Sequence, residues 1–264
     1  MAHFDIKGDS NPGIKRTENQ DRFIIGSSQQ TSIKGKGCLI AVADGMGGHK
    51  GGALAAEMAV NTLITDYYQN PSEPITDSLK KAFFSANQKI YEMASKNKEY
   101  EGMGTTLTAV VLMGSYFYYA HVGDSRGYIV STMKIKQFTR DHSIVGDLIA
   151  EGIITEKEAE KHPDRNIITR AIGTDPTVEI DISTGAIQLK NRQCILLCSD
   201  GLIKVVQKRE IKKIIHKTKD AEKICKTLIK KANGRGGPDN ITVVIAIQKK
   251  TERWPLLHKI KQLL

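Results

Sequence analysis

The chain lacks any uninterrupted apolar run of the roughly 18 residues that cross a membrane as a helix. Its start, MAHFDIKGDS, also lacks the charged-then-apolar pattern of a secretory signal. Cysteine is scarce, with four in 264 residues, and no two have the CxxC spacing of a zinc site or a redox pair. These absences predict a cytosolic protein without a transmembrane segment, whose cysteines are reduced and mostly buried.

Three signatures of phosphate chemistry are missing as well. No cysteine is followed six residues later by arginine, which argues against a thiol-based phosphatase. Gly8 and Gly13 have the spacing of a Walker A motif, but Ile14 stands where its lysine belongs. A kinase-type GxGxxG is absent too. Any phosphate chemistry in this chain therefore needs a different set of groups.

Negative charge is in the minority, because 39 Lys and Arg stand against 29 Asp and Glu, a net charge of +10. Most of the excess falls in residues 209–217, 223–231 and 248–264. This positive excess is explained either by solvated lysines on amphipathic helices or by a positive surface that attracts phosphorylated protein. No aromatic residues are interleaved with these charges as stacking platforms, so we expect no nucleic-acid partner.

Short-range patterns predict both strands and helices. Apolar residues at spacings of three and four predict a helix at about 74–96, and further helices are predicted at about 53–68, 209–218 and 220–234. Ser72 and Asp220 are predicted as N-caps of two of them. Seven short segments rich in β-branched or aromatic residues and bounded by turn residues predict strands at 38–44, 105–113, 116–124, 126–130, 178–182, 193–200 and 241–247.

Runs of strands alternate with pairs of helices along the chain. Gly114-Ser115 and Asp124-Ser125 are short enough for hairpins, so the strands are expected to pair antiparallel. This order predicts one α+β domain in which helices pack on the outside of antiparallel sheets. Residues 142–168 fit neither pattern and predict a small excursion from the core.

The stretch VADGMGGHKGGA, residues 42–53, ends an apolar run on Asp44 and then places five glycines within eight residues. A flexible turn is the simplest interpretation. However, four more aspartates stand at the edges of predicted strands or apolar stretches, most of them beside glycine: Asp21, Asp124, Asp200 and Asp239. Five carboxylates in this setting predict convergence at one end of the sheets, where their repulsion calls for cations.

Oxygen ligands without histidine or cysteine at zinc spacing select Mg²⁺ or Mn²⁺. The carbonyl of Gly45, free of a bulky side chain, can reach an ion that Asp44 holds. Two such ions about 4 Å apart lower the pKa of a bridging water towards about 7, and the electrophile that suits this site is phosphorus. Arg16, five residues before Asp21, is either a forked phosphate ligand or an ordinary surface residue.

Eight short motifs, taken in their order along the chain, resemble those of a known protein family. They are R-x-x-N-Q-D (16–21), D-G-M-G-G-H (44–49), G-T-T (104–106), V-G-D-S-R (122–126), T-R-D-H-S (139–143), T-R-A-I-G (169–173), S-D-G-L (199–202) and G-P-D-N-I-T (237–242). Over about residues 4–248 the chain resembles bacterial type 2C serine/threonine protein phosphatases of the metal-dependent PPM family.

The resemblance implies a four-layer αββα sandwich, in which two antiparallel sheets lie between helix pairs, with residues 142–168 as a mobile flap. It implies hydrolysis of phosphoserine and phosphothreonine in proteins without a covalent enzyme intermediate. Such an enzyme opposes serine/threonine kinases, and we expect phosphorylated proteins, a kinase among them, as partners of a monomer. The phosphatase domain is expected over 1–248, followed by a basic amphipathic tail at 249–264.

The resemblance also implies roles for the site residues. Asp44 bridges two metal ions, Gly45 gives a carbonyl to one of them, and Asp21 acts largely through water. Asp200 and Asp239 complete the first site, while Asp124 together with Asp200 matches a third-metal site of bacterial members. Arg16 matches the phosphate-binding arginine. The expected catalytic residues are thus Arg16, Asp44, Asp200 and Asp239, with two or three Mn²⁺ or Mg²⁺ ions as cofactors.

Two departures from the eukaryotic pattern stand out. Met46 replaces a histidine thought to protonate the leaving alcohol. A water is expected to take that role. His49 is not expected to do so, because a histidine in a loop is commonly structural. Gln20 replaces an acidic residue. Of the remaining polar residues, Asn240 is expected to orient Asp239, and His142 to fix the start of the flap.

Two alternatives stay open for the function and three for the tail. One alternative function is a catalytically silent module that binds phosphoproteins, and the other is a regulatory phosphatase that acts on a sigma-factor antagonist. The tail, WPLLHKIKQLL from Trp254, is an interfacial helix, a partner-docking segment or, as we expect, a segment packed on the chain's own surface.

Overall fold

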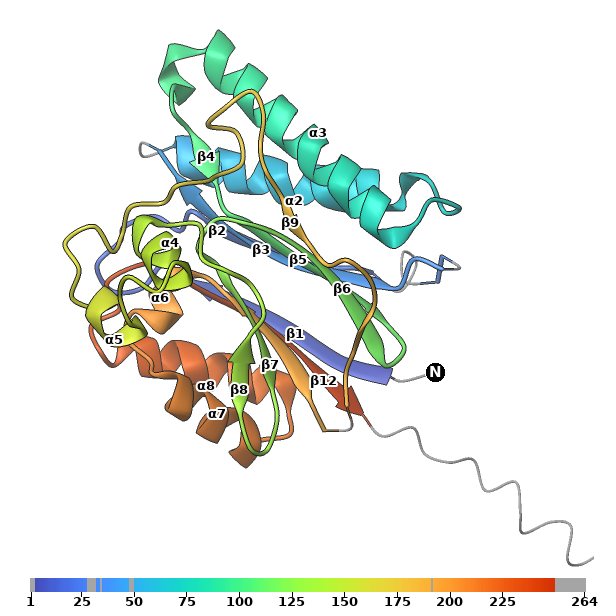
Figure 1. Cartoon of the computed structure of the whole chain (residues 1–264), viewed down its shortest axis with the longest axis vertical. Helices are drawn as coiled ribbons and strands as arrows, with labels where there is room; N and C mark the ends of the chain where they lie inside the picture. The colour runs from blue at the N-terminus through green and yellow to red at the C-terminus, as the bar shows by residue number, and fades with distance from the viewer. Residues whose placement is uncertain (1–2, 28–31, 34, 48–49, 191, 250–264) are drawn as a thin grey trace, which may run out of the picture.

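The computed structural model describes residues 3–27, 32–33, 35–47, 50–190 and 192–249. Two β-sheets lie face to face, and a pair of helices covers the outer side of each sheet (Figure 1). This arrangement confirms the predicted α+β class and the four-layer αββα sandwich. The predicted tail lies almost wholly in residues 250–264, outside the described residues.

One sheet has seven antiparallel strands in the order β10-β6-β5-β3-β2, with β4 paired to β3 and β9 to β6. Its strands are β2 (Asp21–Ile25), β3 (Cys38–Met46), β4 (Gly104–Thr105), β5 (Leu107–Met113), β6 (Tyr116–Val122), β9 (Asp181–Ile182) and β10 (Ile187–Gln188). The glycine at position 114 adopts φ +58° in the hairpin between β5 and β6, as the sequence predicts.

The other sheet has five antiparallel strands in the order β1-β12-β11-β7-β8. They are β1 (His3–Asn11), β7 (Arg126–Val130), β8 (Ile135–Gln137), β11 (Cys194–Cys198) and β12 (Ile241–Lys249). In this sheet, β1 and β8 are not predicted by the sequence pattern. Both lie at sheet edges, where charged residues alternate with the apolar ones and weaken the strand signal.

Each layer of helices buries an apolar face. Helices α2 (Gly51–Gln69) and α3 (Ile75–Lys96) share a buried cluster with the seven-stranded sheet, and α7 (Lys208–Lys217) and α8 (Ala221–Asn233) share one with the five-stranded sheet. A third cluster, with Ile40, Val42, Ile195 and Val244, fills the space between the sheets. Four short helices complete the described part of the fold: η1 (Lys98–Tyr100), α4 (Ile144–Ala150), α5 (Glu156–Ala159) and α6 (Asp200–Ile203). No helix in the described ranges is long and apolar enough to span a bilayer.

The predicted helix ends agree with the structure to within two residues, but one of the two predicted caps is wrong. Asp220 does cap α8, because its carboxylate accepts a 2.9 Å hydrogen bond from the amide of Lys223. The hydroxyl of Ser72 instead donates to Asn70 Oδ1 at 2.9 Å, and α3 begins after Pro74 without a side-chain cap. The turn before α3 therefore uses the hydroxyl that the sequence assigned to the helix.

The predicted hairpin at Asp124-Ser125 is also wrong. Strand β6 belongs to the seven-stranded sheet and β7 to the five-stranded sheet, so residues 123–125 cross from one sheet to the other. Gly123 makes the crossing possible, since it has φ +108° and a Cβ there would lie 2.6 Å from Thr106 Cβ. The crossing places Asp124 between the end of β6 in one sheet and the start of β7 in the other.

The predicted excursion, residues 142–168, leaves the core and returns to it at a point next to where it began. Ser143 and Ile168 form an isolated β-bridge at its base, and helices α4 and α5 lie within it. His142 fastens this base, since its amide donates to the carbonyl of Gly123 at 2.8 Å and its Nδ1 accepts from the amide of Gly123 at 3.1 Å. The excursion is thus anchored directly beside Asp124.

Candidate active site

Asp21 and Asp44 lie opposite each other on neighbouring strands. The register of β2 and β3 pairs the Cα atoms of these two residues. Asp21 is only 1% exposed, and its Oδ2 accepts a 2.7 Å hydrogen bond from the hydroxyl of Ser199 in the other sheet's layer. The seven-stranded sheet therefore brings two carboxylates to one edge.

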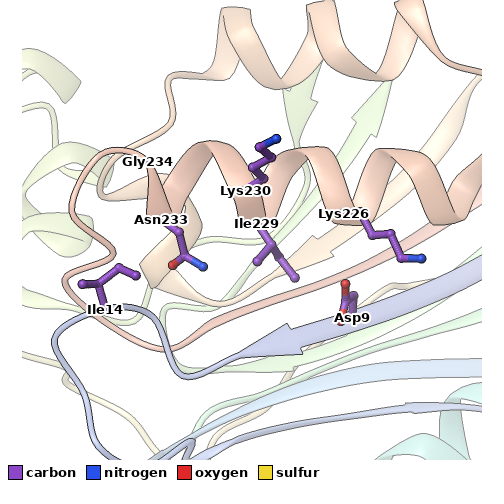
Figure 2. Close-up of a pocket in the computed structure, with 7 residues that line it drawn as sticks. All are labelled: Asp9, Ile14, Lys226, Ile229, Lys230, Asn233 and Gly234. Atoms are coloured by element: carbon purple, nitrogen blue, oxygen red, sulfur yellow. The ribbon is translucent and has the colours of Figure 1, made fainter.

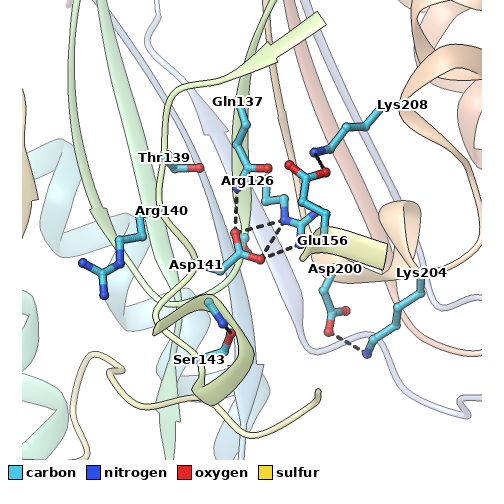
Figure 3. Close-up of polar contacts among 12 residues, drawn as sticks. Arg126, Gln137, Thr139, Arg140, Asp141, Ser143, Glu156, Asp200, Lys204 and Lys208 are labelled. Carbon is cyan, nitrogen blue, oxygen red and sulfur yellow. Dashed lines mark hydrogen bonds and ion pairs between the residues drawn. The ribbon is translucent and has the colours of Figure 1, made fainter. Parts of the chain in front are cut away.

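Asp200 and Asp239 come from the five-stranded sheet. Asp200 follows β11 and opens α6, and Asp239 precedes β12, which pairs antiparallel with β11, so both lie at the same end of the sheet. Lys204, one turn along the helix from Asp200, contacts both carboxylates. Its Nζ lies 2.5 Å from Asp200 Oδ2 and 2.9 Å from Asp239 Oδ2, and Figure 3 shows the first of these contacts.

Buried hydroxyl groups connect the strand ends to the crossing that carries Asp124. Thr106 Oγ1 accepts from the amide of Asp44 at 2.9 Å and lies 2.8 Å from the hydroxyl of Ser125. Thr105 Oγ1 donates to the carbonyl of Asp44 at 2.9 Å. These contacts hold the backbone beside both aspartates, so the positions of Asp44 and Asp124 are coupled.

The electrostatics show that the five carboxylates share one site. Desolvation raises the pKa of Asp44 well above its ordinary value, and the charges of Asp21, Asp200, Asp124 and Asp239 raise it further. Burial raises the pKa of Asp21 to about 6. Burial and then the charge of Asp200 raise the pKa of Asp124 to about 7. The structure thus brings together all five aspartates that the sequence singled out.

Arg16 also reaches this site. Its Nε donates to Asp239 Oδ1 at 2.8 Å and its Nη2 donates to Asp239 Oδ2 at 3.1 Å, while 57% of the side chain remains exposed. Burial alone would raise the pKa of Asp239, but the hydrogen bonds from Arg16 and Lys204 outweigh it and lower that pKa. Asp239 is thereby kept as a carboxylate between two cationic side chains.

Asn240 holds the loop that carries Arg16. Its Oδ1 accepts from the amide of Gln20 at 2.9 Å, and its Nδ2 donates to the carbonyls of Pro12 and Glu18 at 2.9 and 2.8 Å. Its backbone amide also donates to Asp239 Oδ1 at 3.0 Å. Asn240 therefore positions the arginine loop with its side chain and Asp239 with its backbone.

Three carboxylate oxygens at this site are buried without a hydrogen-bond partner: Asp21 Oδ1, Asp124 Oδ1 and Asp200 Oδ1. Buried carboxylate oxygens normally find a donor or a cation, so this set fits hard divalent ions. As they stand, no three His, Cys, Asp or Glu side chains among the described residues form a ready metal cage. Lys204 and Arg16 supply the positive charge instead, because they pair with Asp200 and Asp239.

A steric conflict explains why position 45 is glycine, whether or not an ion binds there. A Cβ there would lie 2.0 Å from the carbonyl oxygen of Gly52 at the start of α2. Its neighbour Met46 ends β3 and has no proton to donate. His49 lies outside the described residues.

A second polar network lies next to residues 123–125, the segment that crosses between the sheets, and begins at the first residue of β7. Arg126, the first residue of β7, binds Asp141 through Nε and Nη2 at 2.8 and 2.5 Å, both to Oδ2. Gln137 donates to the other oxygen of that carboxylate at 2.7 Å (Figure 3). Glu156 of α5 pairs with Lys208 of α7 at 2.7 Å, which links the excursion to the outer helices. The excursion is thus attached both at its base and through α5.

Two side chains of this site, Lys204 and Ser199, were not predicted from the sequence. Lys204 stands four residues after Asp200, a spacing that pairs opposite charges on a helix and was available as a signal. Ser199 was noted only as part of the motif S-D-G-L, whereas in the structure its buried hydroxyl donates to Asp21 and accepts from the amide of Thr242. The local sequence around Ser199 does not indicate that its partner is Asp21 in the other sheet.

Comparisons with known proteins agree with this arrangement. Residues 14–232 match the family model described as protein phosphatase 2C. The chain is 37% identical over 220 residues to the serine/threonine phosphatase Stp of Listeria monocytogenes, a match that covers 81% of this chain and 86% of that protein.

Solved structures agree as well. The serine/threonine phosphatase of S. agalactiae superposes with a TM-score of 0.85 at 37% identity, covering 94% of this chain and all of that one. The catalytic domain of the phosphatase PstP, solved with two manganese ions, superposes with a TM-score of 0.80 at 31% identity, covering 94% of this chain and all of that one.

Proposed function

The chain belongs to the protein phosphatase 2C family and is a serine/threonine protein phosphatase, and from that premise we propose that its acidic site works with two or three bound Mn²⁺ or Mg²⁺ ions. The single observation that carries this proposal is the convergence of five carboxylates, three of them with a buried oxygen that has no partner. Such a cluster is electrostatically costly unless cations complete it.

Five side chains and one carbonyl would hold the ions. They are the carboxylates of Asp21, Asp44, Asp124, Asp200 and Asp239 and the carbonyl of Gly45. When bound, the ions supply Lewis-acid activation of water and neutralise charge on the phosphoryl group. PstP, a similar phosphatase, has been solved with two manganese ions, which supports the same metal here.

Arg16 would bind the substrate phosphate. Its guanidinium already makes a two-pronged contact with a carboxylate, the geometry that also suits two phosphate oxygens. Arg16 would turn this fork from Asp239 to the substrate phosphate when Asp239 serves as a metal ligand. Arg16 is more than half exposed, so an incoming phosphoprotein can reach it.

The leaving alcohol requires a proton donor, and Met46 cannot serve. His121 and His142 are engaged elsewhere: His121 lies 2.8 Å from Thr108 Oγ1 through Nδ1 and 2.8 Å from the carbonyl of Arg140 through Nε2. His142 contacts Gly123 and Asp181. We therefore assign the proton to a water at the site. We propose that this enzyme reverses serine/threonine kinase action and that it does so as a cytosolic monomer.

Turnover of a phosphothreonine peptide tests the proposal. Phosphate release is expected with Mn²⁺, and it is expected to stop with a chelator and to return when Mn²⁺ is restored. The Asp44→Asn variant is expected to bind the peptide without turnover. Turnover that persists in chelator would contradict the metal-dependent mechanism, and peptide binding without turnover by the unaltered protein would point to a silent binding module.

A further inference from the structure

Two of the eight short motifs, G-T-T (104–106) and T-R-A-I-G (169–173), lie side by side near the acidic site. The amide of Thr105 donates to the carbonyl of Ile172 at 3.0 Å, and the amide of Ile172 donates to the carbonyl of Thr105 at 2.8 Å. The hydroxyl of Thr105 donates in turn to the carbonyl of Asp44 at 2.9 Å. The second motif is therefore connected to the backbone of Asp44 through a single residue.

A buried asparagine of α3 holds the end of the second motif. Asn87 is only 2% exposed on a helix face that is otherwise mainly apolar, and burying its amide would be costly without partners. It has partners in residues 169–175, which we call the return arm because they lead back from the excursion. Its Oδ1 accepts from the amide of Gly173 at 2.7 Å, and its Nδ2 donates to the carbonyl of Asp175 at 2.9 Å.

The return arm and α3 are in close contact at this point. A Cβ at Gly173, which has φ +91°, would lie 2.1 Å from Ile90 Cγ2 on the same helix. Figure 1 shows the segment before β9 passing beside α3 and β4. Hydrogen bonds and packing thus both fix the return arm to the outer helix.

The opposite helix layer has a counterpart in Asn233, the last residue of α8. Its Nδ2 donates to Asn11 Oδ1 at 3.0 Å, and the same oxygen accepts from the amide of Gly13 at 3.0 Å. Asn11 ends β1, immediately before the loop that carries Arg16. Figure 2 shows Asn233 beside Ile14 at one end of an open hollow of about 620 Å³ between α8 and β1. Helix α8 therefore holds the arginine loop, as α3 holds the return arm.

We propose that Asn87 and Asn233 are positioning residues through which the two outer helix layers support different parts of the phosphatase site. Asn87 holds the return arm against Thr105 and so keeps the backbone of Asp44 in place. Asn233 fixes the start of the loop that presents Arg16. This inference rests on the proposed function, in which Asp44 binds metal and Arg16 binds the substrate phosphate. The loss of each asparagine is therefore expected to affect a different step, metal binding in one case and substrate binding in the other.

Asn87→Ala is expected to lower the affinity for Mn²⁺ about tenfold, as the loss of a group that orients a metal ligand commonly does. KM for a phosphothreonine peptide at saturating Mn²⁺ is expected to stay unchanged, because no contact to the substrate phosphate is lost. Titration calorimetry and steady-state kinetics measure the two quantities. Unchanged Mn²⁺ affinity would overturn the role of Asn87.

Asn233→Ala is expected to show the reverse pattern. KM for the same peptide is expected to rise about fivefold, the equivalent of one neutral hydrogen bond, while the affinity for Mn²⁺ stays unchanged. An unchanged KM would overturn the role of Asn233. An equal loss of Mn²⁺ affinity in both variants would overturn the division of roles between the two helix layers.

Amide hydrogen exchange of the metal-free protein gives a readout that does not depend on activity. Asn87→Ala is expected to speed exchange in residues 104–106 and 169–175, and Asn233→Ala in residues 12–18, because each segment loses its attachment to a helix. Unchanged exchange in these segments would overturn this inference alone. Absence of Mn²⁺-dependent turnover by the unaltered protein would instead contradict the proposed function.

Ser78→Ala is the matched control for Asn87→Ala. Ser78 is also buried on α3, at 1% exposed, and its hydroxyl accepts from Lys36 Nζ at 2.6 Å and donates to Glu73 Oε2 at 3.0 Å. Its loss removes buried hydrogen bonds from the same helix without touching the return arm, so thermal stability is expected to fall while Mn²⁺ affinity stays unchanged. Equal loss of Mn²⁺ affinity in the control would show general destabilisation and overturn the assignment.

A double-mutant cycle tests the route from Asn87 to Asp44. Thr105→Val removes the hydroxyl that holds the carbonyl of Asp44. Because Asn87 acts through Thr105 in this proposal, the loss of Mn²⁺ affinity in Asn87→Ala/Thr105→Val is expected to be smaller than the product of the two single losses. A loss equal to that product would show that the two residues act independently and overturn the route.

Discussion

Ser199 donates a 2.7 Å hydrogen bond to Asp21, and this bond joins the end of β11 in one sheet to the start of β2 in the other. The same hydroxyl accepts from the amide of Thr242 at 2.9 Å and is fully buried. One small side chain thus positions a candidate metal ligand across the interface between the layers.

Ser199→Ala is expected to lower the free energy of unfolding by about 1–3 kcal/mol, because it leaves both the Asp21 oxygen and the Thr242 amide without a partner. Mn²⁺ affinity is expected to fall about 10- to 100-fold as the orientation of Asp21 is lost. Denaturant unfolding with chelator and calorimetric Mn²⁺ titration measure the two effects. Ser131→Ala, at an exposed turn, is the control and is expected to change neither.

Asp44→Asn is expected to have opposite effects on stability and activity. Removing one charge from five crowded carboxylates relieves repulsion, so the metal-free protein is expected to melt at a higher temperature. Turnover is expected to fall at least about 100-fold because the central ligand is lost. A lower melting temperature in chelator would contradict the electrostatic account, since it would indicate simple structural damage.

Lys204→Met is expected to tighten Mn²⁺ binding and to destabilise the metal-free protein. The ammonium group of Lys204 contacts Asp200 and Asp239, so an incoming ion has to displace it. Without the lysine the carboxylates repel one another until a metal binds. Lys208→Met removes a nearby lysine that pairs with Glu156 instead, and it serves as the control in calorimetry and thermal melts. Unchanged or weaker Mn²⁺ binding by Lys204→Met would refute the competition.

Mn²⁺ affinity is expected to rise with pH between about 5 and 8. The folded pKa values of Asp21 and Asp124, about 6 and about 7, are raised, so the metal-free fold holds protons in this window that the unfolded chain has lost. These two groups therefore make the metal-free protein less stable as pH rises through the window, and a metal must displace their protons. Calorimetry in buffers of different ionisation enthalpy counts the protons released. No proton release at pH 6 would contradict the raised values.

Arg16→Ala is expected to raise KM for phosphopeptides chiefly, with a smaller effect on kcat. The guanidinium is expected to contact phosphate in the ground state, so its loss weakens binding before it slows the chemical step. Steady-state kinetics with saturating Mn²⁺ make the distinction. Arg16→Lys keeps the charge but not the fork and is expected to recover only part of the affinity. A pure kcat effect would assign Arg16 to the transition state alone.

Local sequence was informative wherever burial made the pattern strong. Helix α3 has one continuous apolar stripe, and strand β5 is apolar except for Thr108, so both are recognisable in isolation. The five aspartates were found because each stands at the edge of such a segment. Edge strand β1 was missed because its charged residues alternate with Phe4 and Ile6, which gain their apolar surroundings only between the two sheets.

Relations between the two sheets were not accessible from the sequence. A link of three residues at 123–125 suits a hairpin as well as a crossing, and only the placement of β7 beside β11 decides between them. Lys204 likewise looks like any helix lysine until Asp239 is brought beside it from 35 residues away. The sequence therefore predicted the acids of the site but not the lysine that balances them.

Strand β1 pairs with β12 along its whole length, from His3 opposite Lys249 to Asn11 opposite Ile241. Of the described strands, the first to be synthesised thus waits for the last, which follows more than two hundred residues later. Until β12 is synthesised, the five-stranded sheet lacks the strand that pairs with both β1 and β11. Asp239, which precedes β12, does not yet lie near Asp21 and Asp44. A nascent chain therefore assembles its full acidic site only after Asp239 and β12 have been synthesised and β12 has paired with β1.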